Sequence, residues 1–221
     1  MNIQTWATAV RRGESASRLL AANLAMLKHV IPILLLPTLC LANDENPDVP
    51  TELRIFVAAN TSLLAYAGAD LNGDGLSDYV FILERQKMHD AAPETETGQR
   101  PLKIALRQPD NSLKVVKTNH KIMFCSTCGG VFGVPFAELS ATAKSFRVSH
   151  YGGSNWRWTN NFQFNYSRRD DTWQLVRVEE SAFHTSDPET LETLIYKPPK
   201  DFGKIDIADF DPENFKGVGK K

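Results

Sequence analysis

Oxygen-bearing side chains recur at alternate positions in the stretch GADLNGDGLSDYVFIL, which runs from Gly68 to Leu83. Calcium is a hard cation that takes six to eight oxygen ligands from carboxylates, amides and backbone carbonyls. A loop of this spacing points successive oxygens inward, and Gly75 permits the sharp turn that this requires. The stretch therefore predicts one structural calcium ion, held by the side chains of Asp70, Asn72, Asp74 and Asp78 and by the backbone carbonyl of Leu76.

The calcium loop differs from an EF-hand, because its twelfth position is Phe81 instead of glutamate and its flanks have the pattern of strands. It resembles the calcium loop of the integrin-α type repeat, in which D-x-N-x-D-G-x-x-D links two strands of a sheet. The pattern occurs once, so the resemblance does not imply a propeller. The alternative is a metal-free hairpin turn built on Asn72-Gly73 or Asp74-Gly75. Such a turn leaves the clustered charges of Asp70 and Asp78 unexplained.

The two cysteines of the segment FCSTCGGVFG, Cys125 and Cys128, are spaced as Cys-x-x-Cys. A zinc site would need further ligands, and His120 is the one histidine nearby. A thioredoxin-type redox centre would place the first cysteine at a helix N-terminus, which the following glycines disfavour. We therefore expect a disulfide that closes a glycine-rich loop, with redox activity as the alternative.

The segment HYGGSNWRW, from His150 to Trp158, is rich in aromatic and polar residues. Two glycines break the strand, and side chains then alternate between the two faces of the next strand. The segment suggests a binding surface; the alternative is core packing beside a β-bulge. It contains no Gly-x-Ser-x-Gly motif, and we assign no catalytic residue. The candidate surface residues are His150, Trp156, Arg157 and Trp158.

The elements that position these residues read as mostly β. Thr51 can cap a short helix that ends at Asn60, and helical periodicity is absent after that. Apolar runs of strand length follow at 62–70, 78–85, 100–108, 112–124, 145–151, 156–167 and 172–181, and one or two more are expected in the C-terminal tail. This order predicts an antiparallel meander, or a partly closed barrel or sandwich, folded over a single core.

The N-terminal residues 1–42 have the order of a secretory signal, with Lys28, an apolar run and a small residue at Ala42. The apolar run is too short, and too interrupted by prolines, for a stable membrane span. Lipidation at Cys40 or a retained anchor is the alternative, and Met26 is a second candidate start. Cleavage after Ala42 would leave a polar leader at 43–50 and a single β-rich domain at 51–221.

Removal of residues 1–42 takes away four basic residues and one acidic residue, so the net charge changes from −1 to −4. The remaining basic residues are scattered, which argues against nucleic acid as a partner. The stretches around the calcium loop, the cysteines and the double glycine together resemble a group of small exported proteins of Gram-negative bacteria. That resemblance implies a periplasmic, secreted or surface-associated domain and carries no catalytic residues.

We therefore expect an exported calcium-binding domain that binds another protein or envelope component, for example as an inhibitor or immunity protein. A calcium-dependent periplasmic hydrolase using His150 and Arg157 and a structural subunit of the cell envelope are the alternatives.

Overall fold

The structure is a computed structural model that describes residues 49–85 and 100–218. These residues belong to a compact unit that spans Glu45–Lys221. The predicted signal peptide, most of the predicted leader and the polar segment 86–99 lie outside the described residues. Among the residues described, no helix reaches the length and apolar character that crossing a membrane requires.

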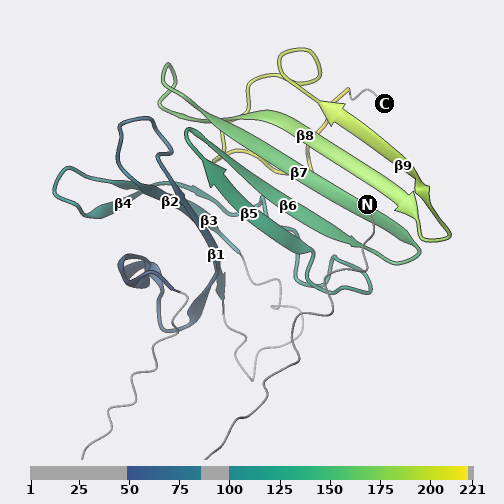
Figure 1. Ribbon diagram of the computed structural model, residues 1–221, viewed down its shortest axis with the longest axis horizontal. Coiled ribbons are helices and arrows are strands. Elements are labelled where there is room, and N and C mark those ends of the chain that lie inside the picture. Colours follow the sequence, from purple (N-terminus) through teal and green to yellow (C-terminus); the bar gives the residue numbers. More distant parts are fainter. Residues whose placement is uncertain (1–48, 86–99, 219–221) are drawn as a thin grey trace, which may run out of the picture. The chain divides into compact units, whose positions relative to one another are not determined.

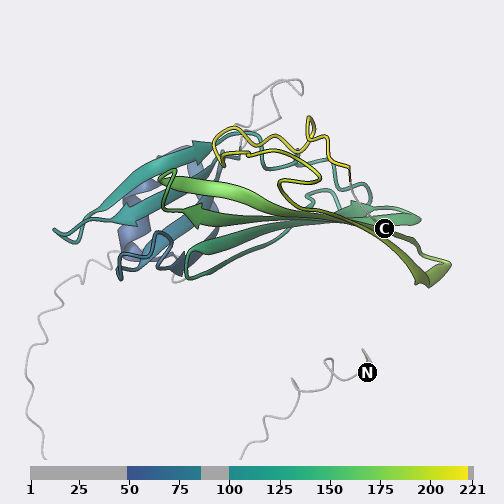
Figure 2. The same cartoon turned by 90° about the horizontal axis from the view of Figure 1, so that it is seen from above.

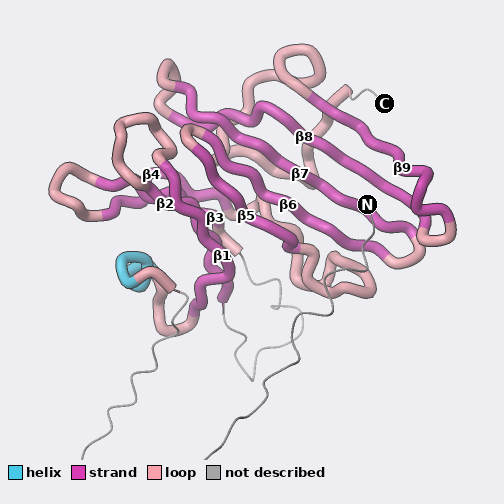
Figure 3. Tube along the Cα trace, viewed as in Figure 1, coloured by secondary structure: helices cyan, strands magenta, loops and turns pink. Residues whose placement is uncertain are grey.

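Two antiparallel sheets form this unit, each a meander of consecutive strands (Figures 1 and 3). The arrangement confirms the predicted antiparallel β class, as two packed sheets and not a closed barrel. Sheet A contains β1 (Thr61–Ala69), β2 (Asp78–Arg85), β3 (Leu102–Arg107) and β4 (Leu113–Asn119). Sheet B contains β5 (Phe136–Thr142), β6 (Ser145–Gly153), β7 (Trp156–Ser167), β8 (Thr172–His184) and β9 (Asp187–Tyr196).

The predicted N-terminal helix is shorter than expected and has 3-10 geometry over η2 (Thr51–Phe56). The side chain of Thr51 makes no capping hydrogen bond, and the preceding Pro50 takes the N-cap position instead. Leu53 of η2 is fully buried in a small cluster with Phe81 and Leu83 of β2. This cluster covers the face of sheet A that points away from sheet B, which explains why β2 is apolar on both faces.

The strand predicted at 112–124 ends early, at Asn119. The buried Asn119 side chain accepts hydrogen bonds from the backbone N–H groups of Lys121 and Ile122, so it turns the chain out of the sheet. Its amide also donates to the carbonyls of Ile207 and Phe210 in the C-terminal tail. β5 was not among the predicted strands, because its sequence FAELSAT is short and lacks a continuous alternation of apolar residues.

The main core lies between the two sheets. Val80, Ile82 and Ile104 of sheet A face Phe162 and Phe164 of sheet B, and all five side chains are buried. The C-terminal tail completes this core, since the ring of Phe210 packs edge-on against the rings of Phe162 and Phe164. Figure 2 shows the tail lying along one side of sheet B.

A buried side-chain hydrogen bond links the loop between β1 and β2 to β8 of sheet B. The indole N–H of the buried Trp173 donates to the backbone carbonyl of Leu71 at 3.0 Å. Leu71 is itself fully buried within the main core. The loop is therefore held in place by a residue that lies 102 positions later in the chain.

We expect Trp173→Phe to lower the free energy of unfolding by about 1–3 kcal/mol, because it leaves the buried carbonyl of Leu71 without its donor. Urea unfolding followed by circular dichroism measures this change. Trp158→Phe is the matched control, since no hydrogen bond of the Trp158 indole is found among the described residues. An equal loss in both variants would contradict the role assigned to the hydrogen bond.

Candidate functional site

The three aspartates of the predicted calcium loop converge. Carboxylate oxygens of Asp70, Asp74 and Asp78 all lie within 4.8 Å of one another. The loop joins β1 to β2, two neighbouring antiparallel strands, as the sequence pattern predicts. Two oxygens on opposite sides of a calcium ion lie up to roughly 5 Å apart, given Ca–O distances of about 2.4 Å. The spacing of the carboxylates is thus compatible with one shared cation.

The backbone of the loop orients two of these carboxylates. Asp70 accepts hydrogen bonds from the backbone N–H groups of Gly73 (2.7 Å), Asp74 (3.2 Å) and Gly75 (3.1 Å). Asp74 accepts from the backbone N–H of Leu76 at 2.8 Å and from the Asn72 amide at 2.8 Å. The same bonds would also stabilise a metal-free turn, which is the alternative interpretation of the loop.

Asp78 differs from the other two aspartates because it is fully buried. Its carboxylate accepts the backbone N–H of Leu71 at 2.9 Å and that of Arg107 at 2.8 Å. Burial raises the pKa of Asp78, the two backbone donors oppose that rise, and the charges of Asp74 and Asp70 add to it. A bound cation would offset the cost of keeping this carboxylate ionised in the interior.

Lys144 approaches the same loop from the turn between β5 and β6. Its backbone N–H donates to the carbonyl of Asp70 at 2.8 Å. Its side chain lies against Gly73, where an added Cβ would sit 2.1 Å from Lys144 Cε and 2.8 Å from Nζ. Gly73 also has a φ of +81°, so the backbone conformation there favours glycine. The acidic loop is therefore fixed against the end of sheet B.

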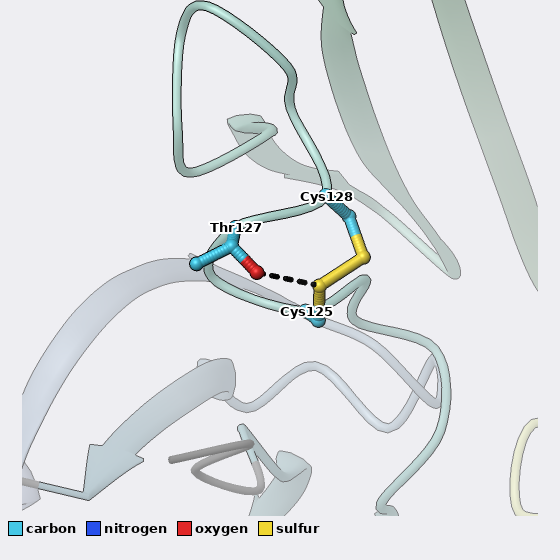
Figure 4. Close-up of a disulfide and its surroundings, with 3 residues drawn as sticks. All are labelled: Cys125, Thr127 and Cys128. Carbon is cyan, nitrogen blue, oxygen red and sulfur yellow. Dashed lines mark hydrogen bonds between the residues drawn. A yellow bond between two sulfur atoms is a disulfide. The ribbon is translucent and has the colours of Figure 1, made fainter. Parts of the chain in front are cut away.

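Cys125 and Cys128 form a disulfide, and Thr127 Oγ1 lies 3.4 Å from Cys125 Sγ (Figure 4). The glycine-rich loop that follows is hydrogen-bonded to the end of β6. Gly153 donates its N–H to the carbonyl of Gly129 at 3.0 Å, and Val131 donates to the carbonyl of Gly153 at 3.2 Å. The disulfide thus begins a loop that lies along the sheet edge.

Glycines on both sides allow this close approach. A Cβ at Gly152 would lie 2.9 Å from Gly129 Cα and 2.5 Å from the Trp158 ring, and one at Gly130 would lie 2.7 Å from the carbonyl oxygen of Gly153. The double glycines at 129–130 and 152–153 are therefore the contact between the loop and β6.

His150 lies in the interior and does not belong to an exposed surface. Its ring packs edge-on against Phe124 at 4.7 Å and near Phe162 at 5.8 Å. Neither ring nitrogen has a hydrogen-bond partner within the part of the chain that the structure describes. Burial, with a smaller contribution from the Arg100 charge, lowers the pKa of His150 to about 4.

The three other candidate surface residues divide between two faces of β7. Trp158 is partly buried on the core-facing side, where its ring packs edge-on against Phe124 at 5.8 Å. Trp156 lies at the strand end and is 63% exposed. Arg157 points to the opposite face, where its guanidinium lies 4.3 Å above the ring of Phe132.

Phe132 brings the disulfide loop into this surface. Val131, Phe132 and Val134 are exposed, although their sequence pattern gave no separate indication of a binding role. Four of the ten large hydrophobic side chains that are exposed among the described residues are thus found around the turn from β6 to β7. We call this end of sheet B the aromatic tip, and it consists of Val131, Phe132, Val134, Trp156 and Arg157, with Arg157 and Phe132 on one face and Trp156 on the other.

Comparison with known proteins adds little to this geometry. No protein-family model and no curated protein sequence matches the chain. A solved structure described as "Structure of a Xanthomonas Type IV Secretion System related protein" is similar at 14% identity and a TM-score of 0.33. The match covers 64% of this chain and 57% of the other, so the chain spans little more than half of that protein's length. A likeness at this level supports no assignment of function.

The buried His150 should make the fold sensitive to acid. Between pH 6.5 and about 4 the unfolded chain binds a proton at this histidine and the folded chain does not, so stability falls as the pH is lowered through this window. The shift corresponds to a loss of about 3 kcal/mol by pH 4. His150→Leu should remove this part of the pH dependence in urea unfolding measured at several pH values. Parallel stability profiles for the two proteins would contradict it.

Proposed function

We propose that this protein is an exported calcium-binding β domain of the cell envelope that acts by binding another protein. An inhibitor or immunity protein is one role of this kind. The observation that carries the proposal is the aromatic tip, where exposed apolar side chains are concentrated on a braced loop and a strand end. An oxidising compartment such as the periplasm or the extracellular space is favoured by the disulfide between Cys125 and Cys128.

The composition and the rigidity of the tip support a binding role. Aromatic residues and arginine are enriched among the residues that dominate protein interfaces. The Arg157 guanidinium stacks on the ring of Phe132, and the centroid of that ring lies 5.1 Å from the centroid of the Tyr151 ring. These contacts orient the side chains before a partner binds. Preorganised side chains lose less conformational entropy on binding. Scattered exposed apolar residues need no explanation, whereas a local group of them does.

Calcium is the cation that the acidic loop favours, because the predicted ligands are all oxygens and include a backbone carbonyl. Its role would be structural. The loop contacts Lys144 before β6 begins, whereas the tip contacts Gly153 where β6 ends. A strand of nine residues is about 26 Å long. The ion would therefore order the junction of the two sheets and would not touch a partner held at the tip.

The hydrolase alternative receives no support from the placement of its residues. His150 pairs with Asn160 on the core-facing side of sheet B, and Arg157 lies three positions before Asn160, on the opposite side. Side chains on opposite faces of one sheet cannot act on one substrate atom. The two residues proposed for catalysis therefore do not form a common site.

We expect calcium to raise the melting temperature of the protein and a chelator to reverse the effect, because a ligand that binds the folded state stabilises it. At a free calcium concentration one hundred times the Kd, the gain would be about 2.7 kcal/mol. Asp74→Ala should abolish the shift measured by calorimetry. Asp209→Ala is the matched control, an exposed aspartate in the C-terminal tail. A wild-type melting temperature that does not change when calcium is added would contradict the metal proposal.

The binding role predicts that a photo-crosslinking amino acid at Val131 captures a defined protein in the cell envelope. The same amino acid at Ile55 is the matched control, because Ile55 is 73% exposed and Val131 is 70% exposed. Ile55 lies in η2, away from the tip. Trp156→Ala should reduce the yield from position 131 by roughly tenfold, the loss expected for an interface anchor. Equal products from both positions would contradict a specific surface at the tip.

A further inference from the structure

We infer that the aromatic tip binds a basic partner protein, through a patch in which lysine or arginine side chains surround an apolar contact. This inference rests on the proposed binding function and specifies the chemistry of the partner. It comes from the charge of the strand ends that lie beside the tip.

The hairpin of β8 and β9 carries a strong negative charge next to the tip. The segment 179–192, which we call the acidic hairpin, contains five carboxylates and no lysine or arginine. Arg177 pairs with Glu179 at its base. The ion pairs found among the described residues include none with Glu180, Asp187 or Glu189. Most of this charge is therefore not neutralised by neighbouring cations.

Backbone pairing makes the acidic hairpin continuous with the tip. Trp156 pairs with His184 across β7 and β8, and His184 pairs in turn with Asp187. The Trp156 ring packs edge-on against the His184 ring at 5.1 Å. The backbone N–H of Thr185 also donates to the carbonyl of Asn155 at 2.8 Å, which joins the two turns. The indole and the carboxylates thus form one surface.

This surface is open to solvent. Residues 185–192 are all exposed, and they include the apolar Leu191, which is 56% exposed. In Figure 2 the hairpin of β8 and β9 extends beyond the C-terminal tail that lies along sheet B. A partner that approaches this end of the hairpin would therefore meet the exposed indole of Trp156 beside exposed carboxylates.

Charge complementarity selects the class of partner. An acidic surface attracts a basic protein, raises the association rate and disfavours acidic proteins. A second copy of this chain would bring identical acidic hairpins together, so it is disfavoured as the occupant. Nucleic acid would also be repelled. Because the tip exposes apolar side chains, the basic patch of the partner must surround an apolar group. This is the usual arrangement of an interface, which has an apolar core and a polar rim.

Nuclear magnetic resonance of the full chain, titrated with peptides of defined composition, tests this inference. The probes are a peptide of alternating lysine and leucine, a glutamate–leucine peptide and a lysine–serine peptide, all of equal length. We expect the lysine–leucine peptide to shift the Trp156 indole signal and the amides of 185–187 and 189–192, but not the indole of the buried Trp173. The other two peptides should bind at least tenfold more weakly, because each lacks one of the two contacts.

The double variant Asp187→Lys with Glu189→Lys should weaken binding of the lysine–leucine peptide about tenfold, since it reverses two exposed charges. Asp209→Lys with Glu213→Lys is the matched control, which makes the same charge change at exposed positions of the C-terminal tail. Equal weakening in both double variants would overturn the inference, because net charge alone would then explain binding. Tighter binding of the glutamate–leucine peptide at the tip would overturn the basic partner and leave the binding role intact. No response at the tip to any peptide would overturn both.

Discussion

The buried carboxylate of Asp78 is the constraint on which the junction of the two sheets depends. It holds the backbone of Leu71 on one side and that of Arg107 on the other. Leu71 passes this constraint to sheet B, because its carbonyl accepts the indole N–H of Trp173. An ionised group in the interior is costly unless hydrogen bonds or a cation compensate it. The electrostatics of one short loop are therefore coupled to the packing of the whole sandwich.

The contact between the acidic loop and sheet B also makes the two ends of that sheet differ in how their side chains are packed. One end is occupied by the acidic loop, Lys144 and the turn before Trp173, where side chains are buried or bonded to one another. The other end of sheet B is not covered by the described strands of sheet A. There the disulfide loop lies along the edge of β6. The apolar side chains of the aromatic tip are exposed there. The backbone beside them is held by the hydrogen bonds that Gly153 makes to Gly129 and Val131.

The sequence predicts much of this fold because its strands alternate clearly and its turns contain characteristic residues. The strand at 156–167 and the position of the acidic loop between two strands follow directly from local patterns. Two features could not be predicted in this way. Asn119 is buried under the C-terminal tail, to which its amide donates at positions 88 and 91 residues later, and His150 is buried by Phe124 from a distant loop. Periodicity places a side chain on a face but does not say what covers that face.

The candidate site also shows that residues close together in the sequence need not share one surface. The sequence grouped His150, Trp156, Arg157 and Trp158 because they are neighbours along the chain, and the two-residue period of the strand divides them between two faces. Arg157 instead contacts Phe132, and Trp156 contacts His184 beside the β8–β9 turn, and both partners are distant in sequence. The glycine pairs at 129–130 and 152–153 are visible in the sequence, but the sequence does not show that they pack against each other and join the loop to the sheet. The proposed binding surface is assembled across this contact, so it would need both the disulfide loop and the strand end.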